Sequence, residues 1–358
     1  MSQQKTSRRS FLQTAAVAAV AGPAIITSKT AQAQAVTLRV GSWLPQHHLI
    51  VSGIVRPWAQ AVEADSEGTV KFDIMTASIG RPPEYYDFCA NGAIDVGYGV
   101  LGHNPGRFLM TEIMGLPFQS PDPWAGSAAA WSTFARYGAR FNEHKGVHIA
   151  GLWVHSEPSI FMRGEPLKTI DDLKGKKIRV GSAITGRIIQ TLGGTPVQLP
   201  PTEAQQAMMS GVADGITFPM ESIEFFKITP AIKSAVKIPG GLIYTDTFWL
   251  GVNQKKFDSL HAKAKAAIEK HGGMALALNS AWAWTSGDNV GRAALEKAGV
   301  RFSALPNSDA AKIKAALKGL DDDWLAKAKE KGLPGEEIMK YADDMALRYT
   351  ATKRVNVV

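Results

Sequence analysis

The sequence contains a single cysteine, Cys89, among its 358 residues. One cysteine excludes an intramolecular disulfide and a metal site built from several thiolates. The stability of the fold must therefore come from an ordinary apolar core, which a hydrophobic content of 45% can supply. No internal repeat or low-complexity tract follows residue 35.

The excess of positive charge is small once the N-terminal segment is set aside. The formal net charge is +8, but residues 1–35 hold four basic side chains and no acid, which leaves +4 for the rest. These charges are scattered, whereas nucleic-acid binding needs a basic stripe with stacking aromatics. The composition predicts no nucleic-acid partner and a mild attraction for anions.

Only one apolar run approaches membrane-spanning length, and it lies near the N-terminus. This run, Phe11–Ile26, is interrupted by a Gly-Pro pair and is shorter than the ~20 residues of a spanning helix. It follows a twin-arginine stretch at 7–12 and precedes two A-x-A patterns at 31–35. These features predict a cleaved signal peptide over 1–35, export by the Tat route, and a periplasmic protein.

Motifs of catalytic and cofactor sites are also lacking. The G-x-G-x-x-G at 97–102 follows a predicted strand, but Pro105 interrupts the helix that a dinucleotide site needs next. Tight turns at the strand's end explain these glycines. His47 and His48 have no partner at metal-binding spacing, and Asp321–Asp323 fits a solvated helix face. We therefore expect no cofactor, no metal and no enzymatic activity.

Predicted strands and helices alternate along most of the chain. The strands are expected at 36–43, 70–76, 94–99, 147–155, 160–163, 177–180, 196–199, 213–218 and 248–253. Helical segments such as 47–64 and 203–210 separate them, and from residue 255 the pattern is mostly helical. This alternation is typical of α/β domains built on largely parallel sheets, and the length allows two of them.

One predicted strand carries a basic residue within its apolar run. Arg179 lies in the strand 177–180, which ends at Gly181 and Ser182 before a helix begins. A glycine and a small hydroxyl at that position favour an anion pocket at the helix N-terminus. Because an unpaired buried arginine is costly, either a ligand carboxylate or an internal acid should pair with it. The residues alone leave both possibilities open.

This region resembles the solute-binding proteins of TRAP transporters (tripartite ATP-independent periplasmic transporters). The resemblance is carried by DLKGKKIRV at 172–180 and LGGTPVQLPPTEAQQAMMSGVADG at 192–215, with agreeing segments at 78–80, 91–96 and 116–118. It covers roughly residues 37–260. In that family the strand arginine pairs with the ligand carboxylate, a role that the resemblance assigns to Arg179.

Two positions depart from the family's pattern. Phe218 stands where many members have an asparagine that touches the carboxylate, and Ser159 stands where some have a second arginine. The departures favour a ligand with one carboxylate and an apolar or aromatic body. The aromatic residues expected to enclose it are Phe218, Trp249, Trp153 and Tyr98, although such residues at strand ends are also common in cores.

The resemblance implies two α/β lobes, a type II-like periplasmic-binding-protein fold with a ligand cleft between the lobes and long C-terminal helices. Lobe I is expected to contain 36–155 and about 247–288, and lobe II 156–246 and about 289–358. Closure of the lobes requires ligand contacts from both. Beside Arg179 and Ser182, the expected partners are Ser78, Arg81 and Tyr98, with Trp43 and His47 behind them.

The expected function is that of a periplasmic receptor. It would capture a small organic acid, such as an aromatic or keto monocarboxylate, and deliver it to the TRAP membrane permease subunits. Two alternatives remain open at this point. A Tat-exported periplasmic enzyme would show visible absorbance or bound metal, and the binding protein of an ATP-driven importer would differ in its membrane partner.

Overall fold

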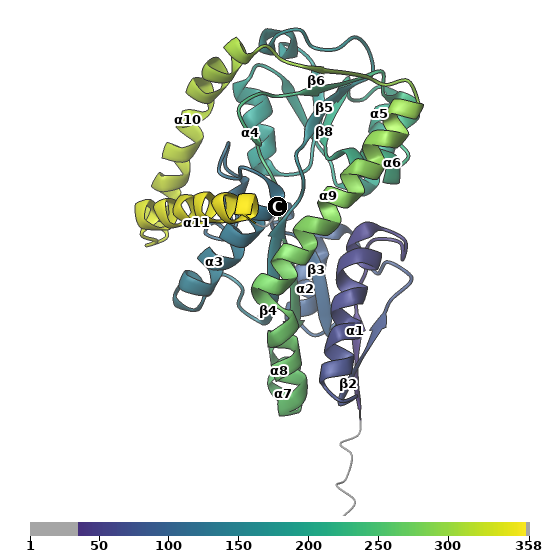
Figure 1. Cartoon of the computed structure of the whole chain (residues 1–358), viewed down its shortest axis with the longest axis vertical. Helices are drawn as coiled ribbons and strands as arrows, with labels where there is room; N and C mark the ends of the chain where they lie inside the picture. Colours follow the sequence, from purple (N-terminus) through teal and green to yellow (C-terminus); the bar gives the residue numbers. More distant parts are fainter. Residues whose placement is uncertain (1–34, 356–358) are drawn as a thin grey trace, which may run out of the picture. The chain divides into compact units, whose positions relative to one another are not determined.

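The computed structural model describes residues 35–355 (Figure 1). The twin-arginine stretch and all but the last residue of the expected signal peptide lie outside this range. No helix within 35–355 is both long and apolar enough to cross a membrane. The chain from Ala35 onward is built on two β-sheets, and we call the parts built on them the first and second lobe.

The first lobe contains a five-stranded sheet in the order β2-β1-β3-β10-β4. Its strands are β1 (Val36–Val40), β2 (Val70–Ile74), β3 (Val96–Val100), β4 (Val147–Val154) and β10 (Thr247–Asn253). β1 is parallel to β2 and β3, whereas β10 is antiparallel to both β3 and β4. Every residue of β3 and β10 is buried, in keeping with their central position.

The second lobe contains a six-stranded sheet in the order β11-β9-β5-β8-β6-β7. Its strands are β5 (Ser159–Met162), β6 (Lys177–Val180), β7 (Thr195–Gln198), β8 (Gly215–Phe218), β9 (Ser234–Lys237) and β11 (Arg301–Ala304). β6 is parallel to β7 and β8, and β5 is antiparallel to β8 and β9. Parallel pairs therefore surround the strand that carries Arg179.

Helices pack on both sheets. Those of the first lobe are α1 (Arg56–Asp65), α2 (Tyr85–Ala90), α3 (Pro123–Phe141), α7 (Gln254–Ser259) and α8 (Ala262–His271), and those of the second are α4 (Ala183–Thr191), α5 (Pro201–Ser210) and α6 (Met220–Phe225). Their ends follow local sequence signals. Pro201 occupies the first turn of α5, and Gly211 ends it in the left-handed conformation (φ 80°) that glycine tolerates.

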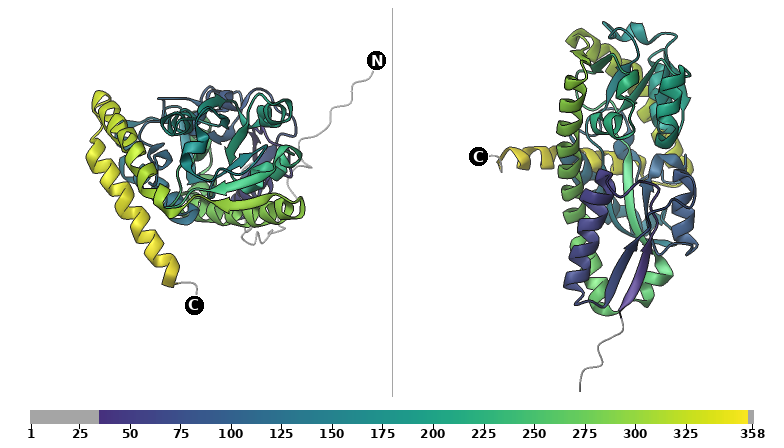
Figure 2. Two further views of the ribbon diagram at one scale, coloured as in Figure 1. Left: turned by 90° about the horizontal axis from the view of Figure 1, so that it is seen from above. Right: turned by 90° about the vertical axis from the view of Figure 1, so that its right-hand side faces the viewer.

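The chain crosses between the two sheets three times. β4 leads to β5, β9 leads back to β10, and α9 (Gly273–Lys297) then leads to β11. α9 contacts α3 and β4 in the first lobe and α6 in the second (Figures 1 and 2). The expected two-lobed α/β architecture with long C-terminal helices is therefore confirmed.

The last two helices differ from the expected division into lobes. α10 (Asn307–Glu330) contributes Leu317 to the core of the second lobe but Trp324 to that of the first. α11 (Gly335–Val355) packs on α3 and lies beside α10 (Figure 2), and its Ile338 and Ala342 belong to the first core. The C-terminal part of 289–358 thus lies with the first lobe, because the apolar face of α11 is buried there.

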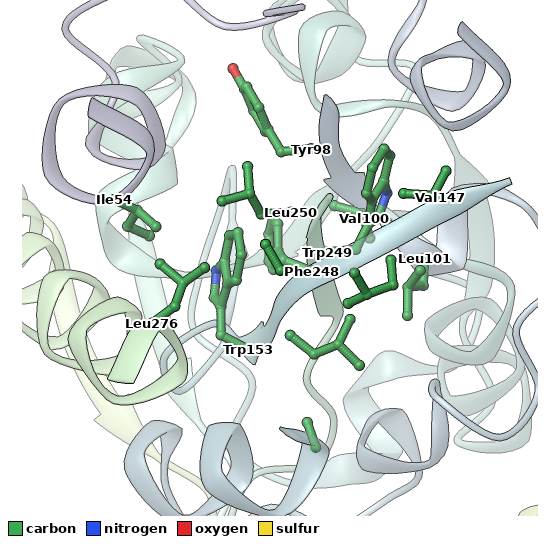
Figure 3. Close-up of a cluster of buried hydrophobic side chains, with 14 of the residues drawn as sticks. Ile54, Tyr98, Val100, Leu101, Val147, Trp153, Phe248, Trp249, Leu250 and Leu276 are labelled. Atoms are coloured by element: carbon green, nitrogen blue, oxygen red, sulfur yellow. The ribbon is translucent and has the colours of Figure 1, made fainter. Parts of the chain in front are cut away.

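Large aromatic side chains fill the core of the first lobe (Figure 3). Trp153 and Trp249 are 0% and 1% exposed, and Tyr98 is fully buried. Gly97 makes room for one of them, since a Cβ atom added there would lie 2.8 Å from the Trp249 ring. This glycine lies within β3 and serves packing, rather than forming the turn expected from the sequence.

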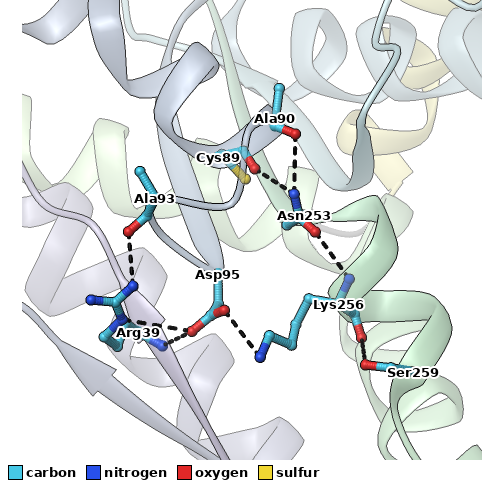
Figure 4. A network of polar contacts seen from close by, with 8 residues as sticks. All are labelled: Arg39, Cys89, Ala90, Ala93, Asp95, Asn253, Lys256 and Ser259. Carbon is cyan, nitrogen blue, oxygen red and sulfur yellow. Dashed lines mark hydrogen bonds and ion pairs between the residues drawn. The ribbon is translucent and has the colours of Figure 1, made fainter.

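A polar network joins α2, β10 and α7 (Figure 4). The Asn253 side-chain amide donates to the carbonyl of Cys89 at 2.8 Å, and its oxygen accepts from the backbone N–H of Lys256 at 3.0 Å, which caps α7. Asp95 accepts from the backbone N–H of Arg39 at 2.8 Å and lies 3.4 Å from Lys256 Nζ. These contacts hold the ends of β1, β3 and β10 in register.

Candidate functional site

Arg179 projects from β6 and is almost completely buried, with 1% of its surface exposed. Its Nε and Nη2 atoms donate to the backbone carbonyl of Leu199 at 3.1 and 2.7 Å. Its Cζ atom lies 4.4 Å from the centroid of the Phe218 ring, a cation–π contact. Nη1 has no hydrogen-bond partner among the described residues. The guanidinium is thus fixed in place with the two N–H groups of Nη1 left free.

The internal acid considered as a partner for Arg179 does not form an ion pair with it. Within residues 35–352, no carboxylate oxygen lies within 4.0 Å of the guanidinium nitrogens. Burial lowers the pKa of Arg179 to about 10, so the side chain remains charged at neutral pH. A buried cation with a free N–H group is suited to bind an anion.

Arg179 lines a small cavity between the two lobes. The first lobe and the crossing segments contribute Trp43, His48, Ile50, Val100, His103, His155, Asp246, Phe248 and Trp284, and the second contributes Arg179, Gly181, Pro201, Phe218, Pro219, Ser222 and Phe226. The space open to the centre of a water molecule is ≈ 40 Å³. One water needs roughly 10–15 Å³ by this measure, so the cavity suits a small ligand.

Several buried polar atoms around this cavity lack partners. His103 Nδ1, His155 Nε2 and Trp284 Nε1 make no hydrogen bond among the described residues. Burial lowers the pKa of His103 to about 4 and that of His48 to about 3, so both rings are neutral at pH 7. Because unsatisfied buried polar atoms are rare in folded proteins, they mark positions where a ligand can donate or accept.

Asp246 brings a negative charge to the same cavity. Burial would raise the pKa of its carboxyl, but interactions with the side chains of His155 and Ser182 outweigh this effect and lower it. Asp246 is therefore ionised at neutral pH. His155 Nε2 approaches its Oδ2 atom to 3.7 Å, which is beyond hydrogen-bond distance.

The structure brings three of the expected ligand-binding residues together at the cavity. Arg179, Phe218 and Trp43 all line it. Tyr98 lies behind Trp43, since its carbonyl accepts from the Trp43 indole N–H at 3.2 Å and its hydroxyl is 2.5 Å from Ser42 Oγ. The expected order of these two aromatic residues is thus reversed.

The other expected residues do not line the cavity. Trp153 and Trp249 lie in the core of the first lobe. Ser182 lies beneath the cavity, with Oγ 2.8 Å from Thr185 Oγ1. Ser78 donates to the carbonyl of Gly80 at the surface.

Two further expected residues, Arg81 and His47, do not line the cavity either. Arg81 of the first lobe pairs with Glu203 on α5 of the second lobe at 2.9 Å, and its side chain is 67% exposed. His47 is exposed and packs against Phe225, while its neighbour His48 is buried and lines the cavity.

Sequence reasoning missed Asp246, His103 and His155. The register of β10 against β4 pairs Thr247 with Val154, which places Asp246 next to His155 at the crossing between lobes. His155 is the last residue of the strand predicted at 147–155, and Asp246 lies two residues before the one predicted at 248–253. Only the pairing of β4 with β10, which are almost a hundred residues apart, brings the two side chains together.

The comparisons with known proteins agree with this site. Residues 40–327 match the family model described as bacterial extracellular solute-binding protein, family 7. The chain belongs to this family. It is the family of TRAP solute-binding proteins, which are periplasmic and work with a TRAP membrane permease. The resemblance noted in the sequence is thereby confirmed.

Individual relatives support the assignment along most of the chain. A TRAP periplasmic solute-binding protein from Bordetella bronchiseptica, solved with (R)- and (S)-mandelate, is 30% identical with a TM-score of 0.83, covering 87% of this chain and 99% of that one. A marine-metagenome TRAP protein specific for aromatic acids, in complex with 3-hydroxybenzoate, is 29% identical (TM-score 0.83; 88% and 99% covered). The outer membrane transporter protein TsaT of Comamonas testosteroni is 25% identical over 312 residues (87% and 91%).

Proposed function

We propose that this TRAP receptor binds an aromatic monocarboxylate. The observation that carries the proposal is the free Nη1 atom of Arg179, which faces a small cavity walled by aromatic rings. One buried cation matches one carboxylate, and Phe218 occupies the position where a second polar contact is common in the family. The ligands of the two solved relatives, mandelate and 3-hydroxybenzoate, belong to the same chemical class.

The position of the cavity explains how binding would be communicated. Trp43 and His103 come from the first lobe, whereas Arg179 and Phe218 come from the second. A ligand that touches both sides stabilises the closed arrangement, because those contacts are lost when the lobes separate. The permease would then recognise the closed receptor. This cycle of capture and release requires no catalytic step.

Export by the Tat route is part of the proposal. It rests on the twin arginines Arg8 and Arg9 and the apolar run that follows them. Replacing both arginines by lysine should leave the protein unprocessed in the cytoplasm, as judged by cell fractionation. Normal processing of the double variant would contradict this route.

The central experiment measures binding of benzoate, mandelate and 3-hydroxybenzoate by thermal shift and calorimetry, with and without Arg179→Ala. A ligand at 1,000 times its Kd stabilises a protein by about 4 kcal/mol, which gives a clear shift. We expect Arg179→Ala to abolish it.

Arg292→Ala is the matched control, because this exposed arginine on α9 also stacks on a phenylalanine, Phe302, at 4.5 Å. It should bind like the unmodified protein. Equal shifts for Arg179→Ala and the unmodified protein would show that the carboxylate binds elsewhere.

A further inference from the structure

Arg179 and Asp246 face the same small space. A Cβ atom added to Gly181 would lie 3.6 Å from Asp246 Oδ2 and 3.7 and 3.8 Å from the two terminal nitrogens of Arg179. The two side chains nevertheless form no ion pair within 4.0 Å among the described residues. They therefore flank the same space, with the free Nη1 group of Arg179 on one side and a carboxylate on the other.

A ligand whose only polar group is a carboxylate would satisfy Arg179 but not Asp246. Arg179 and Asp246 carry opposite charges that balance each other. A ligand carboxylate next to Arg179 places a second anion close to Asp246, in surroundings where Coulomb interactions are weakly screened. The neutral rings of His48 and His103 provide no positive charge to offset it. Only protonation of His155, 3.7 Å from Asp246 Oδ2, would supply one.

A hydrogen-bond donor on the ligand would resolve this conflict. A carboxylate can accept several hydrogen bonds, so Asp246 remains available as an acceptor beside Ser182 and His155, whose Nε2 atom stays 3.7 Å away. The side chains of Arg179 and Asp246 both lie within 4 Å of the Cβ position of Gly181. A donor that reaches Asp246 must therefore lie close to the ligand carboxylate that binds Arg179. A substituent on the carbon next to the carboxylate satisfies this condition, whereas a hydroxyl across an aromatic ring does not.

We propose that Asp246 is a specificity-determining residue that accepts a hydrogen bond from a hydroxyl or ammonium group on the α-carbon of the ligand. The inference rests on the proposed function and narrows its substrate class to aromatic acids with an α-donor. His155 and Ser182 act as positioning residues for the Asp246 carboxylate.

The test compares three acids by isothermal calorimetry: mandelate with an α-hydroxyl, phenylglycine with an α-ammonium, and phenylacetate with neither. A hydrogen bond to a charged group changes affinity by about 10- to 100-fold. We expect the unmodified protein to bind mandelate or phenylglycine at least tenfold more tightly than phenylacetate. Whichever of the two binds more tightly identifies the donor.

Substitution of Asp246 then shows whether this residue makes the distinction. Asp246→Asn should bring the affinities together, chiefly by tightening phenylacetate, because the repulsion between carboxylates is removed. Asp73→Asn removes the same charge from an exposed position on β2 and should leave the ratio unchanged. An unchanged ratio in Asp246→Asn would overturn the inference.

The unmodified protein alone also provides a decisive result, whether or not the variant folds. Equal affinities for mandelate, phenylglycine and phenylacetate would overturn the inference while leaving the aromatic-acid function intact. Tight binding of phenylacetate with uptake of one proton would also overturn the inference, because a histidine would then balance the charge. Calorimetry in buffers of different ionisation enthalpy measures this uptake. Failure to bind any aromatic acid would instead contradict the proposed function itself.

Discussion

Phe218 illustrates how one residue adapts the site to a class of ligand. Its ring lies 4.4 Å from the guanidinium carbon of Arg179 and stacks on Phe226. The ring restricts the arginine and supplies apolar surface to the cavity. An asparagine at this position, as is common in the family, would add a polar contact but remove both effects.

Phe218→Asn should therefore weaken binding of aromatic acids by about tenfold, as expected for the loss of buried apolar area and a cation–π contact. Small acids such as acetate should lose little affinity. Calorimetry of both ligand types checks this. Phe302→Asn is the control, because it also removes a ring beneath an arginine but lies outside the cavity; equal losses in both variants would refute the assignment.

Buried ionisable residues next to the cavity make stability depend on pH. Burial raises the pKa of Glu221 to about 8, an effect that the hydrogen bond from Ser222 reduces and the charge of Asp288 increases. The folded protein therefore retains a proton that the unfolded chain releases above its ordinary pKa of 4.5. The contribution of Glu221 to the free energy of unfolding is fully present below pH 4.5. It declines above that pH and is lost as the pH rises through 8.

Glu221→Gln should reduce the loss of stability between pH 6.5 and 8. A proton that only the folded state retains changes the free energy of unfolding by about 1.4 kcal/mol per pH unit. The buried histidines, whose pKa values are lowered, act in the opposite direction and only below about pH 6.5. Denaturant titrations at pH 6.5, 7.25 and 8 measure the effect, with exposed Glu336→Gln as the control. A pH dependence identical in both variants would contradict this role for Glu221.

At the scale of elements, the contact between α9 and α6 depends on glycine. A Cβ atom at Gly291 would lie 2.6 Å from the backbone nitrogen of Glu221 and from the carbonyl carbon of Met220. These are backbone atoms that cannot move aside without shifting α6. In α10, by contrast, a Cβ atom at Gly319 would meet no atom within 4 Å apart from its chain neighbours and the backbone of its own helix.

Alanine at the two positions should thus have opposite effects. Gly319→Ala should stabilise the protein by about 0.5–1 kcal/mol, because alanine favours a helix interior. Gly291→Ala should destabilise it by about 1–3 kcal/mol through overpacking. Urea denaturation of both variants measures the difference. Stabilisation by Gly291→Ala would show that α9 and α6 are not in close contact.

The sequence indicated the elements well where they carry a strong apolar pattern. The strand at 177–180 is found with the expected bounds, and those expected at 70–76 and 248–253 differ by two residues or fewer at either end. The strands β9 and β11 were missed. The site was predictable in part: Arg179 followed from the strand pattern and the resemblance, whereas Asp246 depends on strand pairing.

At the scale of the whole molecule, the exposed ion pair between Arg81 and Glu203 links the lobes at 2.9 Å. Exposed pairs contribute little to stability, but this one is formed only when the lobes are close together. It therefore bears on the opening of the site rather than on folding.

Arg81→Ala should weaken ligand binding by less than about fivefold, with an unchanged unfolding transition in the absence of ligand. The effect should decrease at high salt, where exposed pairs are screened. A double-mutant cycle with Glu203→Ala, measured by calorimetry at low and high salt, isolates the pair. Additive effects of the two substitutions would show that the contact does not influence closure.

The three crossings of the chain also determine how the gene can be divided. Strand β10 belongs to the first sheet but follows β9 of the second sheet in the chain. Strand β11 belongs to the second sheet but follows β10 and α9. No single cut separates the two lobes: a cut before β5 removes β10 from the first sheet, and a cut after β10 removes β11 from the second. A reporter protein that responds to ligand should therefore be inserted within one lobe's loops or joined at the chain ends, since a cut between the lobes would leave at least one sheet divided between the two products.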